Sequence, residues 1–132
     1  MTKKPWIGVW KVIEPGLEGF MVITDTHFTE CLQAAGRIPA EGDPPTESES
    51  FHLLQTLHAR AGTYQLPEWN GDPSDPERRG SGTALLTIVV CHNPKEVGKQ
   101  YKLEMWVDGD TARERMIYPD KEGEIFSWER VG

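Results

Sequence analysis

WIGVWKVI, at residues 6–13, predicts the first strand of a β-sheet, because the stretch is rich in β-branched and aromatic side chains. The expected last strand, residues 124–131, contains the triplet Trp128-Glu129-Arg130. Trp10 on the first strand and Arg130 on the last indicate a sheet that closes on itself, so that the two ends of the chain meet. A closed barrel of this size usually leaves a cavity, and this cavity is the main clue to function.

Short alternating segments fill the chain between these two strands and are separated by Gly, Pro, Asn and Asp. Tight turns at Asp25-Thr26 and Asp108-Gly109-Asp110 favour β-hairpins. Eight antiparallel strands are enough to close a barrel around side chains or one small ligand. The expected fold class is therefore all-β, an eight-stranded antiparallel up-and-down barrel, and its other strands are residues 19–25, 27–34, 63–67, 83–91, 100–107 and 111–118.

One α-helix is expected between the third and fourth strands, at about residues 46–61. Thr46 and Glu49 have the spacing of a capping box, in which each side chain bonds the backbone N–H of the other residue. Gly62 is a typical helix end. The apolar stripe of this helix is expected to lie on the barrel mouth or wall, and it consists of Phe51, Leu54, Leu57, His58 and Ala61.

Composition limits the classes of protein to consider. A chain of 132 residues is expected to form one domain, residues 1–132. A net charge of -7 with scattered basic residues argues against nucleic-acid binding. No apolar run approaches the ~20 residues that span a bilayer, and no signal-peptide core is present, so we expect no membrane partner and a cytoplasmic location. Cys31 and Cys91 are then expected to be free, buried and inert thiols.

Five short motifs spread over the whole chain carry a family resemblance: Gly8-Val9-Trp10, Gly19-Phe20-Met21-Val22-Ile23, Ala61-Gly62-Thr63-Tyr64, Asn93-Pro94 with Val97-Gly98, and Trp128-Glu129-Arg130. In these motifs the chain resembles the lipocalin-like small barrels of the calycin superfamily, in particular the short bacterial lipocalin-like domain proteins. The resemblance implies that Arg130 packs across Trp10 near the closed end, a cation–π contact worth about 0.5–2 kcal/mol. It also implies that this pair holds the barrel shut and does not touch ligand.

Alternation along each strand predicts which side chains line the cavity. On residues 27–33 the more apolar face carries Glu30, and on residues 111–118 it carries Glu114. Strand 83–91 is apolar on both faces, so its orientation stays open. The expected ligand-binding residues are Phe28, Glu30, Leu32, Leu54, His58, Tyr64, Trp69, Tyr101, Leu103, Met105, Glu114, Met116 and Tyr118.

Two of these residues have alternative roles. His58 lies at the edge of the expected helical stripe, where it either caps the cavity or is an ordinary helix-edge histidine. Trp69 lies in the expected loop of residues 68–82. It either folds over the barrel mouth and stacks on a ligand, or pins the loop to the barrel wall.

Glu30, Glu114 and Tyr64 are the candidates for acid–base catalysis. A carboxylate in an apolar interior is costly unless it is paired or protonated, and its pKa then rises toward a range useful for proton transfer. The alternative is that one or both acids point outward, because a one-residue slip in register turns every side chain on a strand to the other face.

No metal site is expected, because none of the four histidines has a metal-ligand partner at helical or alternate-strand spacing. No cofactor is expected either: the nitrobindin-like haem barrels use a C-terminal His, and no His follows His92. Nucleophile-elbow, phosphate-loop and dinucleotide motifs are absent from the sequence. Cys91 and His92 are expected to point to opposite faces of a strand, which argues against a reactive pair.

Three interpretations of function remain. The first is a protein that binds an apolar or aromatic small molecule in the barrel cavity. The second, suggested by relatives of the lipocalins, is a non-redox enzyme of the cyclase or isomerase type in specialised metabolism, which uses a buried acid in the same cavity. The third is an interaction domain whose barrel is filled by its own side chains. Trp106, expected on the outer face, suggests a homodimer.

Overall fold

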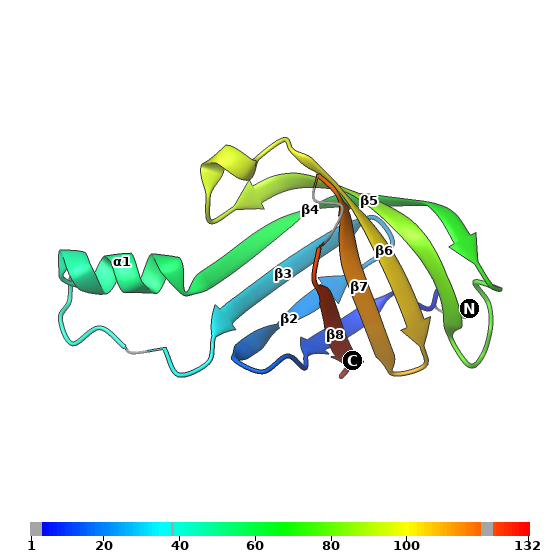
Figure 1. The fold of residues 1–132 in the computed structure, drawn as a ribbon, viewed down its shortest axis with the longest axis horizontal. Coiled ribbons are helices and arrows are strands. Elements are labelled where there is room, and N and C mark those ends of the chain that lie inside the picture. Colours follow the sequence, from blue (N-terminus) through cyan, green and yellow to red (C-terminus); the bar gives the residue numbers. More distant parts are fainter. Residues whose placement is uncertain (1–3, 38, 120–122) are drawn as a thin grey trace.

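A closed β-barrel is the core of the structure, a computed structural model that describes residues 4–37, 39–119 and 123–132, without the side chain of Leu54. In this part of the chain eight antiparallel strands each pair with the next, and the last pairs with the first (Figure 1). The predicted up-and-down barrel is confirmed. Its strands are β1 (Gly8–Val12), β2 (Leu17–Ile23), β3 (His27–Ala34), β4 (Leu57–Asn70), β5 (Arg79–Cys91), β6 (Gln100–Asp108), β7 (Thr111–Tyr118) and β8 (Ile125–Arg130).

Two helices interrupt the barrel within the described residues: α1 (Glu47–Gln55) between β3 and β4, and the short 3-10 helix η1 (Pro94–Glu96) after β5. The capping box of α1 is confirmed, since Thr46 Oγ1 accepts from the Glu49 N–H at 3.2 Å and Glu49 Oε1 accepts from the Thr46 N–H at 2.8 Å. No helix in this described part has the length and apolar character needed to traverse a bilayer.

The helix is shorter than the predicted span of residues 46–61, and its docking on the barrel is not observed. It extends outward beyond the end of β4 (Figure 1), and Phe51 is 62% exposed. Residues 57–61 belong to β4 because they pair with β3, with Leu57 opposite Gln33. Long-range strand pairing has therefore overridden a helical pattern of apolar residues. Gly62 does not end the helix; it lies in β4, where a Cβ would overlap the Thr87 carbonyl oxygen.

The predicted loop at residues 68–82 is also shorter, because β4 and β5 extend into it and leave only residues 71–78 between them. Trp69 lies on β4 with its ring 4.6 Å from that of Trp6, centroid to centroid. Gly80 and Gly82 make room for the indole, since a Cβ at either position would overlap it. Of the two roles considered for Trp69, packing against the barrel is the one observed.

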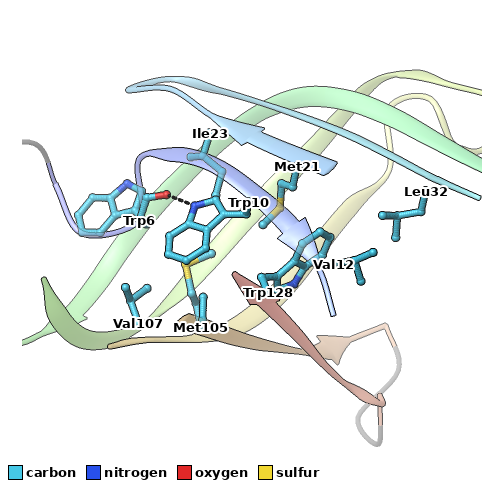
Figure 2. Packing of buried hydrophobic residues seen from close by; sticks show 10 residues of the cluster. Trp6, Trp10, Val12, Met21, Ile23, Leu32, Met105, Val107 and Trp128 are labelled. Carbon is cyan, nitrogen blue, oxygen red and sulfur yellow. Dashed lines mark hydrogen bonds between the residues drawn. The ribbon is translucent and has the colours of Figure 1, made fainter. Parts of the chain in front are cut away.

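Arg130 closes one end of the barrel. Its guanidinium carbon lies 4.2 Å from the Trp10 ring centroid, and its N–H groups donate to the backbone carbonyls of Pro5, Ile7 and Gly109. The Trp10 indole donates to the Trp6 carbonyl at 3.0 Å (Figure 2). The predicted contact between Trp10 and Arg130 is thus confirmed, and it lies at the closed end.

The core fills the barrel near this closed end and thins toward the other. Trp10 packs there with Met21 and Met105, and Trp128 and Val12 continue the same cluster away from the closed end (Figure 2). The two cavities found among these side chains have volumes of only about 20 and 10 Å³. Among the described residues, the barrel has space for a small molecule toward the opposite, open end.

Candidate ligand-binding cavity

The open end of the barrel holds a cavity of about 570 Å³, within the range of roughly 300–1,000 Å³ that is typical of small-molecule sites. Its rim is formed where strands begin and end: Leu17 on β2, Ala34 on β3, Thr56 before β4 and Glu124 before β8. Apolar side chains make most of the inner wall. The full lining is Leu17, Glu30, Leu32, Gln33, Ala34, Gln55, Thr56, Leu57, His58, Arg60, Leu103, Glu114, Met116, Gly123, Glu124, Phe126 and Trp128.

Glu30 is a buried carboxylate with two basic partners from the neighbouring strand. Strand pairing places Glu30 opposite Arg60, and Leu32 opposite His58. His58 Nε2 lies 2.9 Å from Glu30 Oε1, and Arg60 Nε lies 3.6 Å from the same oxygen. Burial alone would raise the pKa of Glu30, but the His58 hydrogen bond and the Arg60 charge outweigh it and hold this pKa below its usual range. Glu30 is therefore ionised at neutral pH.

Glu114 is an equally buried acid in a different environment. Its Oε2 atom has no hydrogen-bond partner among the described residues. Burial, together with the nearby negative charge of Glu30, raises the pKa of Glu114 to about 8, although Arg60 and the approach of Trp128 oppose this rise. At neutral pH the Glu114 carboxyl is accordingly protonated and neutral.

Trp128 brings a second buried polar group to the same cavity. Only 1% of this residue is exposed. The indole approaches Glu114 without reaching hydrogen-bond geometry, and Trp128 Nε1 has no partner in the described part of the chain. Arg60 Nε is a third buried polar atom of the cavity lining without a hydrogen-bond partner among the described residues. Most buried polar atoms in proteins are hydrogen-bonded, so these unpaired ones beside a cavity need an explanation.

The tyrosines lie outside this cavity. Trp6 donates to the Tyr64 hydroxyl at 3.0 Å, and that hydroxyl donates to the Thr24 carbonyl near the closed end; burial raises the pKa of Tyr64. The Tyr101 hydroxyl donates to Glu96, and burial together with this carboxylate raises the pKa of Tyr101 to about 12. Both phenols are thus occupied by other partners.

Tyr118 was expected to point inward, and this prediction is wrong. The residue is 58% exposed. The cause is an irregularity in the pairing of β6 with β7: Leu103 pairs with Met116, but the adjacent Lys102 pairs with Tyr118. One extra residue on β7 reverses the alternation, so Met116 lines the cavity while Tyr118 faces out.

The structure therefore divides the predicted ligand-binding residues into groups. Glu30, Leu32, His58, Leu103, Glu114 and Met116 line the main cavity. Phe28, Tyr64 and Met105 lie deeper, around the small space of about 20 Å³. Tyr101 lies on a separate hollow of about 210 Å³ behind His58 and Arg60, and the Leu54 side chain is outside the described residues.

Arg60, Phe126 and Trp128 line the cavity but were missing from the prediction. Arg60 was assigned to the helix. Strand alternation could have identified Arg60 as a cavity residue. Once β4 is extended toward its N-terminal end, His58, Arg60 and Tyr64 share one face of the strand. The sequence marks Trp128 only through the motif Trp128-Glu129-Arg130.

The cysteines differ from expectation. Both lie within the described residues and are free, but Cys31 is exposed on the outer face rather than buried. Cys91 and His92 were expected to point apart, yet Cys91 Sγ lies 3.6 Å from His92 Nδ1. Strand β5 ends at Cys91, so alternation stops there, and His92 Nδ1 accepts from the Ala59 N–H at 3.1 Å.

The geometry defines a class of protein: a closed eight-stranded barrel with one sealed end and an apolar cavity that contains two buried acids at the other. Within the described residues, no group of three or more His, Cys, Asp and Glu side chains is arranged to hold a metal ion. Comparison with protein families, with curated proteins and with solved structures found no match to this chain.

Proposed function

We propose that this protein is a lipocalin-like binding protein that holds an apolar or aromatic small molecule in the barrel cavity. The observation that carries the proposal is the cavity of about 570 Å³, lined mainly by apolar side chains and sealed at one end by Arg130. Most small-molecule sites combine such a wall with a few polar groups that orient the ligand. Glu30 with its basic partners, Glu114 and Trp128 would be those groups.

A titration with N-phenyl-1-naphthylamine, a neutral apolar dye, tests this proposal. We expect saturable binding of one dye per barrel. Replacing Leu32, which points into the cavity, by Trp should weaken dye binding at least tenfold, because the larger ring occupies the space. Thr29→Trp adds the same ring to the outer face of the same strand and should leave the affinity unchanged. Equal affinities in both variants, or no saturable binding at all, would contradict the proposal.

A second candidate function, acid–base catalysis of a cyclisation or isomerisation, is favoured by the unequal carboxyls. Glu30 is held ionised by His58 and Arg60, whereas Glu114 is held protonated by burial. Two acids whose environments move their pKa values in opposite directions are the usual sign of a base and an acid in one site. Glu30 would accept a proton and Glu114 would donate one, whereas Tyr64 is bonded elsewhere.

A further inference from the structure

Three residues that line the cavity have a buried polar atom without a hydrogen-bond partner among the described residues: Arg60 Nε, Glu114 Oε2 and Trp128 Nε1. Arg60 Nε already lies 3.6 Å from the Glu30 carboxylate, so the other two atoms indicate what kind of ligand the barrel holds. Glu114 Oε2 and Trp128 Nε1 are both fully buried and have no hydrogen-bond partner among the described residues. A buried donor or acceptor that stays unpaired destabilises the folded protein. Both residues line the main cavity, so a bound molecule could complete their hydrogen bonding.

The strand pairing brings these two side chains together. In the β7–β8 pair, Ala112 lies opposite Trp128 and Glu114 lies opposite Phe126. Glu114 and Trp128 are therefore diagonal neighbours on the inner face of the barrel, a spacing that long and aromatic side chains can bridge.

Both groups are hydrogen-bond donors at neutral pH. The indole Nε1–H can only donate. The Glu114 carboxyl is kept protonated by burial and by the neighbouring Glu30 charge, so it also offers an O–H. An acceptor with two lone pairs, such as a carbonyl oxygen, can satisfy two neighbouring donors.

We infer that the cavity takes an uncharged apolar carbonyl compound, with its oxygen seated between the Glu114 carboxyl and the Trp128 indole. The inference rests on the proposed binding function and specifies the ligand's polar group. A hydrocarbon would leave both donors unpaired. A carboxylate would approach the Glu30 charge, beside which His58 and Arg60 already lie at 2.9 and 3.6 Å. An ammonium group would leave the indole N–H without an acceptor.

Four naphthalene probes of similar size test the inference: 2-acetylnaphthalene, its hydrocarbon isostere 2-isopropenylnaphthalene, 2-naphthoate, and the ammonium form of 2-naphthylmethylamine. Affinities are measured by calorimetry or tryptophan fluorescence at pH 7. We expect the ketone to bind at least tenfold tighter than each of the other three.

Variants of the two donors test which residues cause this preference. Glu114→Met and Trp128→Phe each remove one donor and keep an apolar side chain, so each should reduce the ratio of ketone to hydrocarbon affinity at least threefold. Glu129→Met and Trp106→Phe change the same residue types outside the cavity lining and should leave the ratio unchanged. The ratio is insensitive to general damage of the cavity, because such damage affects both probes.

Infrared spectroscopy provides a second readout that needs no variant. The carbonyl stretch of bound 2-acetylnaphthalene should lie at lower frequency than in an apolar solvent, as expected for a carbonyl that accepts two hydrogen bonds. A bound ketone with the unshifted frequency would overturn the inference even if a variant failed to fold.

The outcomes separate the two proposals. If no probe binds, the proposed binding function fails and the inference fails with it. If the hydrocarbon binds as tightly as the ketone, or if the preference survives in both donor variants, the cavity binds ligands but the carbonyl site is wrong. Tightest binding of the naphthoate or of the ammonium probe would likewise replace the carbonyl site by an anion or cation site.

Discussion

Glu30 and Glu114 line one cavity, yet the protein ionises the first and keeps the second neutral. Glu30 has His58 at 2.9 Å and Arg60 at 3.6 Å, whereas Glu114 Oε2 has no hydrogen-bond partner in the described part of the chain. Two carboxylates that were both ionised in this cavity would repel each other strongly. Because His58 and Arg60 both lie beside Glu30, Glu30 carries the negative charge and Glu114 stays neutral.

Glu114→Gln should change how stability depends on pH. The pKa of Glu114 is about 8 in the folded protein against an ordinary value of 4.5, so between these values the folded state holds a proton that the unfolded state has lost. The free energy of unfolding therefore falls as pH rises through this window, by as much as about 1.4 kcal/mol per pH unit. The variant lacks this loss, so it should gain stability relative to wild type from pH 5 to 8.

Urea denaturation at pH 5, 6.5 and 8 measures this difference. Glu129→Gln, a substitution of an exposed acid on the neighbouring strand, serves as the control and should show no such trend. A constant difference between Glu114→Gln and wild type over this range would mean that the Glu114 pKa is not raised.

Arg60→Leu should destabilise the protein by about 3 kcal/mol, because it leaves the buried Glu30 carboxylate with only His58 as a partner. In the double variant with Glu30→Leu no buried charge remains, so most of the lost stability should return. Arg79→Leu breaks ion pairs with Asp75 and Glu77 at an exposed site, where such pairs contribute about 0–1 kcal/mol. Unfolding free energies that simply add in the double variant would refute the coupling of Glu30 to Arg60.

Arg130→Met should separate stability from binding. The variant loses the cation–π contact with Trp10, worth about 0.5–2 kcal/mol, and hydrogen bonds from a charged group to backbone carbonyls. We expect a loss of about 2–4 kcal/mol in unfolding free energy, with the affinity for N-phenyl-1-naphthylamine unchanged, since Arg130 lies at the sealed end. Lys11→Met, on the outer face of β1, is the control for both measurements. A large loss of dye affinity in the folded Arg130→Met protein would place the binding site elsewhere.

The catalytic alternative can be examined with the ketone probe in D2O. If Glu30 acts as a general base, the methyl hydrogens of bound 2-acetylnaphthalene should exchange with solvent faster than in buffer alone, as followed by proton NMR. Glu30→Gln should slow this exchange about 100-fold or more, as is typical when a general base is lost. Wild-type exchange no faster than in buffer would argue for binding without catalysis.

Sequence alone was sufficient for the barrel and for much of the cavity, because alternation along a strand is a strong signal when one face is buried. It placed Leu32 and Leu103 correctly on the inner face, and of the two orientations left open for Glu30 and Glu114 the structure has the inward one. The predicted secondary structure is wrong where a local pattern of apolar residues competes with strand pairing between distant parts of the chain. Residues 57–61 have helical spacing, yet they pair with β3.

Other differences arise from single irregularities. One extra residue on β7 turns Tyr118 outward, and no residue type in that segment marks the position. Arg60 was overlooked because it belonged to the misassigned helix. The pKa difference between Glu30 and Glu114 could not be predicted either, because it depends on which acid receives the basic partners from β4.

Intermolecular nuclear Overhauser effects between bound N-phenyl-1-naphthylamine and the protein methyl groups test the cavity most directly. We expect contacts from the dye to the methyls of Leu32, Leu103 and Met116, which line the hollow, and none to Val22 and Val90, which are 39% and 63% exposed. Contacts confined to these exposed valines, with the Met116 methyl unaffected at saturation, would show that the dye binds the outer surface and that the barrel interior is not a binding site.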